Sequence, residues 1–322
     1  MPTKYIPNIL RSQERVCVSI FFGLLGILGL AIYQDYGIGW DEIVERMDGA
    51  VSLQYALQYL DIKSITPPQE LLSQTFMGPL QFEIYKDRYY PVGFNLPLAI
   101  VESLFHFPNQ QALYFLRHLL TFTIFFIGTY SVFWIAKRRF SSWKVGLLAA
   151  TFLIMSPRIF AESFYNSKDL VLLSIFALGL ATAIQFIFHN SLKAVLIHGI
   201  VCGFAMEIRL MAITLPMMTL VIFVIYSLSN RDCGKKQVFS ISMYLLTIVL
   251  FLLLTWPLLW TSPIENFAAA FKFMSNFKVG VDMLYWGNTI TSTQLPWHYP
   301  ISWIIITSPV FIIILLVLIG QR

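Results

Sequence analysis

Runs of about 20 apolar residues recur along the chain, and they constrain its fold more than any other feature. A helix that crosses a bilayer needs roughly 20 mostly apolar residues, because the hydrocarbon core offers no partner to unpaired backbone groups. Eight stretches meet or approach this length: Val16–Tyr33, Ala112–Ala136, Val145–Phe160, Leu170–Phe188, Lys193–Met206, Leu210–Leu228, Val238–Pro257 and Ile301–Gly320. With a mean hydropathy of +0.70 and 12% charged residues, a soluble domain is excluded. We predict a single all-α, polytopic membrane domain over residues 1–322 with about eight transmembrane helices.

One further apolar stretch, Pro91–Phe107, is expected to lie at the interface or to re-enter the membrane. Pro91 and Pro97 interrupt it, and Glu102 and His106 add polar groups near its end. A ninth full span here would also move the basic segment 137–144 to the outer side, against the charge pattern.

The distribution of basic residues predicts a topology. The first apolar run is too long for a signal peptide and lacks a small-residue cleavage site, so we expect a retained anchor with a cytoplasmic N-terminus. Inner segments then carry Lys4, Arg11, Arg15, Lys137, Arg138, Arg139, Lys144, Lys193, Arg231, Lys235, Lys236 and Arg322. Their only acids are Glu14 and Asp232. This is the positive-inside pattern of a protein integral to a cell membrane, most simply the plasma or inner membrane.

The same map limits the partners of the chain. Its net charge of +5 lies in short inner loops and forms no basic outer face, so a nucleic-acid partner is not expected. Cys17 and Cys202 fall in spans and Cys233 in an inner loop, so no structural disulfide is expected.

Two large loops lie on the predicted outer face, over residues 34–113 and 258–300, and we expect the chemistry there. In the second, Ser262, Pro263 and Glu265 fit the N-cap, N1 and N3 positions of a helix. Its apolar stripe consists of Ile264, Phe267, Ala268, Phe271 and Phe277. Such a helix either lies in the membrane interface or packs on the spans.

The first loop opens with an acidic pair, Asp41 and Glu42, at the start of a predicted juxtamembrane helix. Ile43, Met47, Val51 and Tyr55 recur every four residues behind it. The helix dipole favours ionised carboxylates in a first turn, so this pair suits a general base or an electrostatic clamp. The alternative is a solvated helix start, with Glu42 pairing with Arg46 at i, i+4.

Two further charged groups fall at the outer edge of the predicted spans. Segment 156–169 contains Arg158, Glu162, Tyr165, Lys168 and Asp169, and charges at this depth are costly unless they are paired or functional. An Arg158–Glu162 pair is the structural alternative. Between two later spans, Glu207 and Arg209 form either a local ion pair or, through the guanidinium, a phosphate site.

His298 lies in a third group, Leu295–Pro300, just before the last span. Trp297 and Tyr299 are typical interface anchors, while His298 could contact a headgroup. The remaining histidines show no metal-ligand spacing, and no Gly-rich phosphate loop is present.

The order of these parts resembles that of the GT-C glycosyltransferases, in particular their protein-mannosyltransferase and aminoarabinose-transferase branch (glycosyltransferase family 39). The resemblance rests on Asp41-Glu42, Tyr90–Pro97 with Arg117, Ser156–Asp169, Arg209 and Leu295–Pro300. It covers nearly the whole chain, although members of that group usually carry more spans and often a C-terminal domain.

The resemblance implies a transferase that moves a monosaccharide from a polyprenyl-phosphate donor to an acceptor on the outer face. Asp41, supported by Glu42, would act as the base or orient the acceptor. Cations at Arg158, Lys168 and Arg209 would bind the lipid phosphate, and Asp169 would hold Lys168 or contact the sugar. The remaining substrate-binding candidates are Arg46, Glu162, Tyr165 and His298. No metal is required, but a divalent cation could bind at Asp41.

The sequence is also compatible with two other functions: a transporter or flippase of a lipid-linked or anionic substrate, and a non-catalytic assembly subunit. Transporters often show repeated halves and interrupted spans at matching positions, and the sequence shows neither. Its charges also cluster at the outer edge of the membrane, which favours an enzyme.

Overall fold

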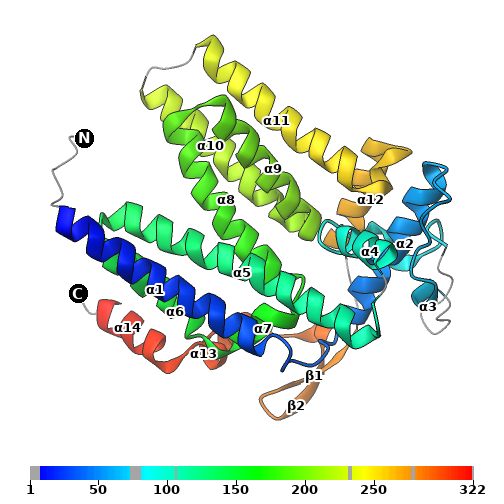
Figure 1. Ribbon diagram of the computed structural model, residues 1–322, viewed down its shortest axis with the longest axis horizontal. Coiled ribbons are helices and arrows are strands. Elements are labelled where there is room, and N and C mark those ends of the chain that lie inside the picture. The colour runs from blue at the N-terminus through cyan, green and yellow to red at the C-terminus, as the bar shows by residue number, and fades with distance from the viewer. Residues whose placement is uncertain (1–7, 73–80, 106, 231–233, 277–279, 321–322) are drawn as a thin grey trace.

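The computed structural model describes residues 8–72, 81–105, 107–230, 234–276 and 280–320 (Figure 1). The predictions made for Cys233 and Phe277 lie outside these residues. The helices are α1 (Asn8–Ile32), α2 (Glu42–Tyr59), α3 (Gln69–Leu72), α4 (Asn95–Leu104), α5 (Gln110–Phe140), α6 (Trp143–Ile154), α7 (Pro157–Tyr165), α8 (Asp169–His189), α9 (Leu192–Ile208), α10 (Thr214–Ser229), α11 (Lys235–Thr255), α12 (Pro263–Ser275), α13 (Tyr299–Thr307) and α14 (Val310–Gly320). Short 3-10 turns are η1 (Lys86–Tyr89), η2 (Leu210–Ile213), η3 (Pro257–Trp260) and η4 (Ser292–Gln294), and strands β1 (Asp282–Tyr285) and β2 (Asn288–Thr291) form a hairpin.

The structure has fewer membrane spans than predicted. Within the described residues, five helical segments are long and apolar enough to cross a bilayer: Ser12–Ile32, Gln110–Phe140, Asp169–His189, Leu210–Ser229 and Lys235–Thr255. A sixth is reached only if α6 and α7, which meet at a bend of 73°, count as one span. The prediction of an all-α, polytopic membrane protein is confirmed, and the prediction of eight spans is wrong.

The predicted spans fail for local reasons. The stretch Val145–Phe160 breaks before Pro157, because proline cannot continue the hydrogen-bond ladder of the preceding helix. The stretch Ile301–Gly320 breaks in the same way at Pro309, between α13 and α14. Helix α9 has 17 residues, just short of a spanning length. As expected, segment 91–107 is not a full span, since α4 is a short apolar helix of 10 residues.

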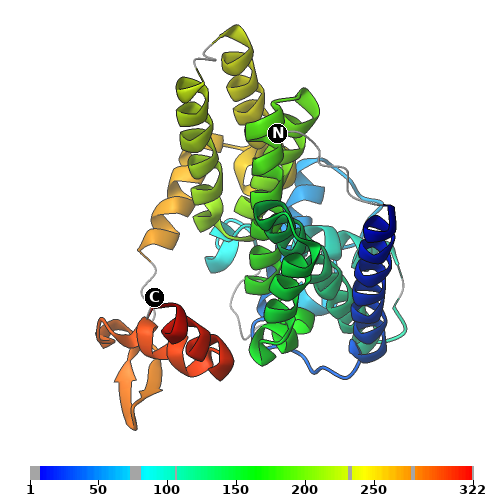
Figure 2. The same ribbon diagram turned by 90° about the vertical axis from the view of Figure 1, so that its left-hand side faces the viewer.

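The long helices pack side by side (Figures 1 and 2). Helix α8 contacts both α5 and α9, and α9 contacts α11 in turn. Helices α5 and α8 approach closely at Gly128, where a Cβ atom would lie 2.6 Å from the Cα atom of Ser174. Small residues are the usual means of close helix packing in membranes, where the lipid provides little hydrophobic driving force.

The two large loops meet at one end of this bundle. Helices α2, α4 and α12 gather there, while the start of α1, the end of α5, the end of α10 and the start of α11 lie at the other end (Figure 1). The ring centroids of Tyr59 and Trp260 are 5.4 Å apart, and those of Tyr89 and Phe273 are 5.3 Å apart. Helix α12 begins at Pro263 as predicted and packs on η1 and η3. The first loop and the η3–α12 part of the second loop therefore pack together at this end of the helices.

Candidate functional site

Three carboxylates share one face of α2. Asp41, Glu45 and Asp48 are spaced i, i+4 and i+7, which places them above one another on a helix. Asp41 is the exposed N-cap residue and makes no capping hydrogen bond with its side chain. Glu45 and Asp48 are buried. The face thus runs from an accessible carboxylate at the start of α2 to a buried one two turns later.

The connection between α7 and α8 lies against this face. The hydroxyl of Ser167 donates a hydrogen bond to Glu45, and the positive charge of Lys168 acts on both Glu45 and Asp48. The hydroxyl of Tyr85 donates to Asp48 Oδ1 at 2.7 Å. Burial nevertheless raises the pKa of Asp48 to about 7 and also raises the pKa of Glu45. Both carboxyls therefore hold a proton more readily than an exposed acid.

Tyr90 connects these carboxylates to the cations of the site. The ammonium nitrogen of Lys168 lies 4.2 Å from the centroid of the Tyr90 ring, a cation–π contact. Burial raises the pKa of the Tyr90 hydroxyl, and the charges of Asp48 and Asp41 raise it further, whereas Arg209 lowers it. Asp41, Asp48, Lys168 and Arg209 therefore all lie within electrostatic reach of one phenol.

Lys168 and Arg209 line a common pocket of about 250 Å³. The remaining lining residues are Tyr90, Pro91, Ile208, Leu210, Met211 and Met274. Arg209 Nη2 lies 2.6 Å from Asp169 Oδ1. Asp169 therefore pairs with Arg209, whereas the resemblance implied that it would hold Lys168 or contact the sugar. The ion pair fixes a guanidinium at the edge of a pocket that is otherwise largely apolar.

A small cavity of about 10 Å³ adjoins this pocket and shares Lys168 with it. Asp48, Ser167 and Glu207 also line the cavity, whose volume is enough for about one water molecule. Three ionisable groups from α2, the α7–α8 connection and α9 therefore meet behind the pocket.

Glu207 anchors segment 90–94 and does not pair with Arg209, contrary to one of the sequence interpretations. It is fully buried and accepts a hydrogen bond from the hydroxyl of Thr255. The backbone N–H of Gly93 donates to the carbonyl of Glu207 at 2.9 Å. A Cβ atom at Gly93 would lie 2.5 Å from Cβ of Glu207, so only glycine allows this approach.

Glu42 and Arg46 lie on another side of α2, toward α5. Glu42 Oε2 accepts from the backbone N–H of Gly39 at 2.6 Å and lies 3.3 Å from His118 Nε2. Arg46 binds Glu102 of α4 with two hydrogen bonds. The predicted Glu42–Arg46 pair is therefore wrong, because each residue finds a partner elsewhere in the fold.

The other sequence candidates lie outside the pocket lining. Arg158 pairs with Glu162, with Nε 2.7 Å from Oε1, as the structural alternative predicted. The Arg158 side chain is 61% exposed. Tyr165 packs against Gly39 near the start of α2. His298 is exposed and lies with the hairpin, its ring centroid 5.8 Å from that of Tyr285.

Sequence reasoning missed Glu45 and Asp48, although their i, i+4 and i+7 spacing with Asp41 was visible. The prediction for this helix was based on its apolar stripe, which has the same helical period but lies on another face of the helix. Across the described part of the chain, no group of three or more His, Cys, Asp or Glu side chains could hold a metal ion.

An apolar groove of about 560 Å³ lies beside the charged pocket, between α10, α11 and α12. Segment 206–213 contributes to both: Met206 and Ile213 line the groove, and Ile208 and Arg209 line the pocket. A pocket with two cations thus adjoins an apolar groove.

These features define a helical integral membrane protein whose charged pocket opens at one end of the bundle, beside an apolar groove. The family model of dolichyl-phosphate-mannose-protein mannosyltransferases matches residues 90–260. The chain belongs to this family, and it is therefore a glycosyltransferase that uses a lipid-phosphate sugar donor. Comparisons with curated proteins and with solved structures give no match. The matched region contains Tyr90, Lys168 and Arg209 but not Asp41. Family membership decides for an enzyme over a transporter or a non-catalytic subunit.

Proposed function

We propose that this protein transfers a monosaccharide from a polyprenyl-phosphate donor to an acceptor hydroxyl or amine on the outer face of the membrane. The observation that carries the proposal is the position of Lys168 and Arg209 in one pocket, between the carboxylate face of α2 and the apolar groove. The pocket would bind the donor headgroup, the groove would bind the donor tail, and the carboxylate face would supply the base that deprotonates the acceptor.

The phosphate of the donor binds at Lys168 and Arg209. A guanidinium offers a planar pair of donors to phosphate oxygens, and an ammonium adds a compact charge. Arg209 is 36% exposed and its pairing with Asp169 is therefore partly solvated. Replacing the contact with the Asp169 carboxylate by contacts with phosphate oxygens therefore costs little free energy. The exposed Arg158 would attract the anion at the entrance.

The prenyl chain lies in the groove between α10, α11 and α12. Its lining is apolar almost throughout, with Met206, Met217 and Leu220 among the contributing residues. Methionine side chains adapt to irregular apolar ligands. The adjacency of groove and pocket lets one lipid occupy both, with its phosphate at the membrane surface.

Asp41 accepts the proton of the acceptor as its oxygen or nitrogen attacks the anomeric carbon. The carbon–oxygen bond to the phosphate breaks, its electron pair stays on the lipid phosphate, and the anomeric configuration inverts. Lys168 and Arg209 stabilise the departing charge. Glu42, held by Gly39 and His118, positions the start of α2. Tyr165 shapes this start from the other side, and Glu162 holds Arg158. His298 contacts headgroups outside the pocket.

The topology follows from charge. Lys137, Arg138 and Arg139 close α5 at the end of the bundle opposite α2 (Figure 1). This end faces the cytoplasm under the positive-inside rule, so the site faces the periplasm, the cell exterior or a lumen. The plasma or inner membrane is the simplest location.

The test uses purified protein in lipid nanodiscs and polyprenyl phosphates that carry mannose, glucose or galactose. Release of the lipid phosphate, with water in place of the acceptor as the nucleophile, is measured by mass spectrometry. We expect one donor to be cleaved, with a KM at least about tenfold higher for Arg209→Gln, since a charge-assisted hydrogen bond contributes about 1.5–3 kcal/mol. Lys193→Gln, an exposed cation at the start of α9, serves as the matched control. Cleavage of no donor, or equal KM values for the two variants, would overturn the proposal.

A further inference from the structure

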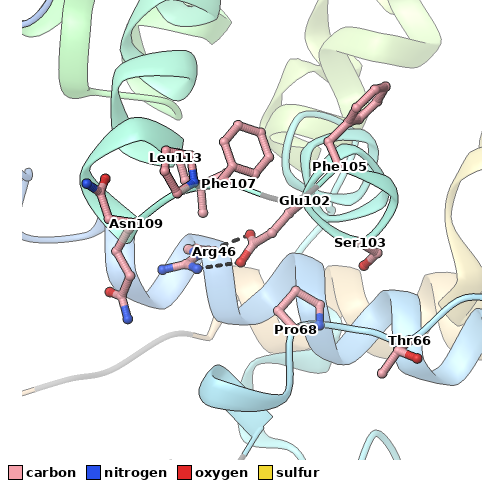
Figure 3. A pocket seen from close by; sticks show the side chains of 11 residues that line it. Arg46, Thr66, Pro68, Glu102, Ser103, Phe105, Phe107, Asn109 and Leu113 are labelled. Carbon is pink, nitrogen blue, oxygen red and sulfur yellow. Dashed lines mark hydrogen bonds and ion pairs between the residues drawn. The ribbon is translucent and has the colours of Figure 1, made fainter.

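A second pocket, of about 420 Å³, lies on the side of α2 that faces α4 and α5 (Figure 3). It shares no lining residue with the Lys168–Arg209 pocket. Its lining includes Arg46, Thr66, Glu102, Ser103, Phe107 and Asn109. A cavity of this size is in the range of small-ligand sites.

The charged pair in its wall restricts the charge of a ligand. Arg46 Nε donates to Glu102 Oε2 at 3.1 Å, and a second bond joins Arg46 to the other carboxylate oxygen. The two side chains are only 6% and 10% exposed. An anion would lie beside the poorly solvated carboxylate of Glu102 and a cation beside the poorly solvated guanidinium of Arg46, and either arrangement is unfavourable. A neutral polar ligand meets neither penalty.

Hydrogen-bonding and aromatic side chains line the pocket together with the Arg46–Glu102 pair. Ser103 and Thr66 offer hydroxyl oxygens that can still accept a hydrogen bond, and Asn109 carries two amide donors. Phe107 adds aromatic surface to the same pocket, whereas the ring of Phe105, which also lines it, points away from the Arg46–Glu102 pair (Figure 3). Sugars match this pattern, because a pyranose has hydroxyls on its rim and an apolar C–H face that packs on rings.

The pocket lies further along α2 than the proposed base and on another side of the helix. Helix α2 rises about 1.5 Å per residue, so Arg46 is roughly 8 Å along the axis from Asp41, and an acceptor must extend round the start of α2 to reach both. We propose that this pocket binds a neutral sugar residue of the acceptor, while the reacting group of the same acceptor extends past the start of α2 to Asp41. The assignment to the acceptor rests on the proposed function, whereas sugar binding itself can be measured independently of it.

The test measures binding of the methyl glycosides of mannose, glucose and galactose to the protein by saturation-transfer NMR. Nanodiscs are used because detergents with sugar headgroups would compete. Ser103→Trp and Thr66→Trp fill the pocket from two separate segments of the chain, so either variant can serve if the other fails to fold. Leu104→Trp is the matched control, since Leu104 follows Ser103, is 53% exposed and does not line the pocket. The methyl glucuronide, an anionic sugar, tests the charge argument.

We expect saturable binding of at least one neutral glycoside, at least tenfold weaker in both pocket variants and unchanged in Leu104→Trp. The glucuronide should bind at least tenfold more weakly than its neutral counterpart. The inference is overturned if no neutral glycoside binds, if a folded pocket variant binds as well as wild type, or if the glucuronide binds equally well. Donor cleavage by the wild-type protein is measured on the same preparation, so a failure of the proposed function is recognised separately.

Discussion

Asp48 is expected to make the stability of the protein fall as the pH rises. Burial raises the pKa of this carboxyl from 3.8 to about 7. Because the folded pKa lies above the unfolded one, its contribution to stability is complete below about pH 4 and is lost as the pH rises through 7. At about 1.4 kcal/mol per pH unit, the full loss is about 4 kcal/mol. Integration over pH 5 to 9 gives a loss of about 3 kcal/mol.

Asp48→Asn removes this titration and keeps an oxygen for the hydroxyl of Tyr85. Thermal unfolding in detergent at pH 5 to 9 should therefore show a shallower decline for the variant, by several degrees at pH 9. Asp61→Asn is the control, because Asp61 is an exposed partner of Lys63. Its φ of 51° also suits asparagine. If wild type and Asp48→Asn decline in parallel while both remain folded, the reasoning about burial is refuted.

Three other changes test the packing of the site. Glu102→Ala leaves Arg46 buried without its partner and should lower the free energy of unfolding by about 3–5 kcal/mol; additive effects with Arg46→Met in a double-mutant cycle would contradict a coupled pair. Gly93→Ala places a Cβ atom 2.5 Å from Cβ of Glu207 and should cost about 1–3 kcal/mol, measured by thermal unfolding. An unchanged melting temperature would show that segment 90–94 can shift to accommodate the added Cβ atom without loss of stability. Met217→Trp fills the apolar groove and should raise the KM for long-chain donors more than for short-chain ones; equal effects on both would place the prenyl chain elsewhere.

The fold was predictable where the signal is local. The start of α2 after Asp41 and the start of α12 at Pro263 follow from periodicity and capping residues. The breaks before Pro157 and Pro309 were also visible as prolines, but the long apolar runs around them outweighed this signal. The hairpin was less predictable: its turn residues Trp286 and Gly287 both have positive φ, but Trp-Gly is not one of the usual sequence signals of such a turn.

The candidate site was less predictable, because its contacts join distant parts of the chain. Arg46 and Glu102 are 56 residues apart, and Glu42 and His118 are 76 apart. A local pair such as Arg158–Glu162 needs only helical spacing. Long-range pairs depend on how α2, α4 and α5 pack, which a single sequence does not reveal.

The most direct test of the role of Asp41 is the rate of sugar transfer by Asp41→Asn. The assay uses the lipid-linked donor that the wild-type protein cleaves, in nanodiscs. Asp35→Asn, an exposed carboxylate in the same loop, is the control. We expect kcat to fall at least about a hundredfold for Asp41→Asn, the lower range for loss of a general base, with an unchanged melting temperature. Turnover at the wild-type rate by folded Asp41→Asn protein would contradict the assignment.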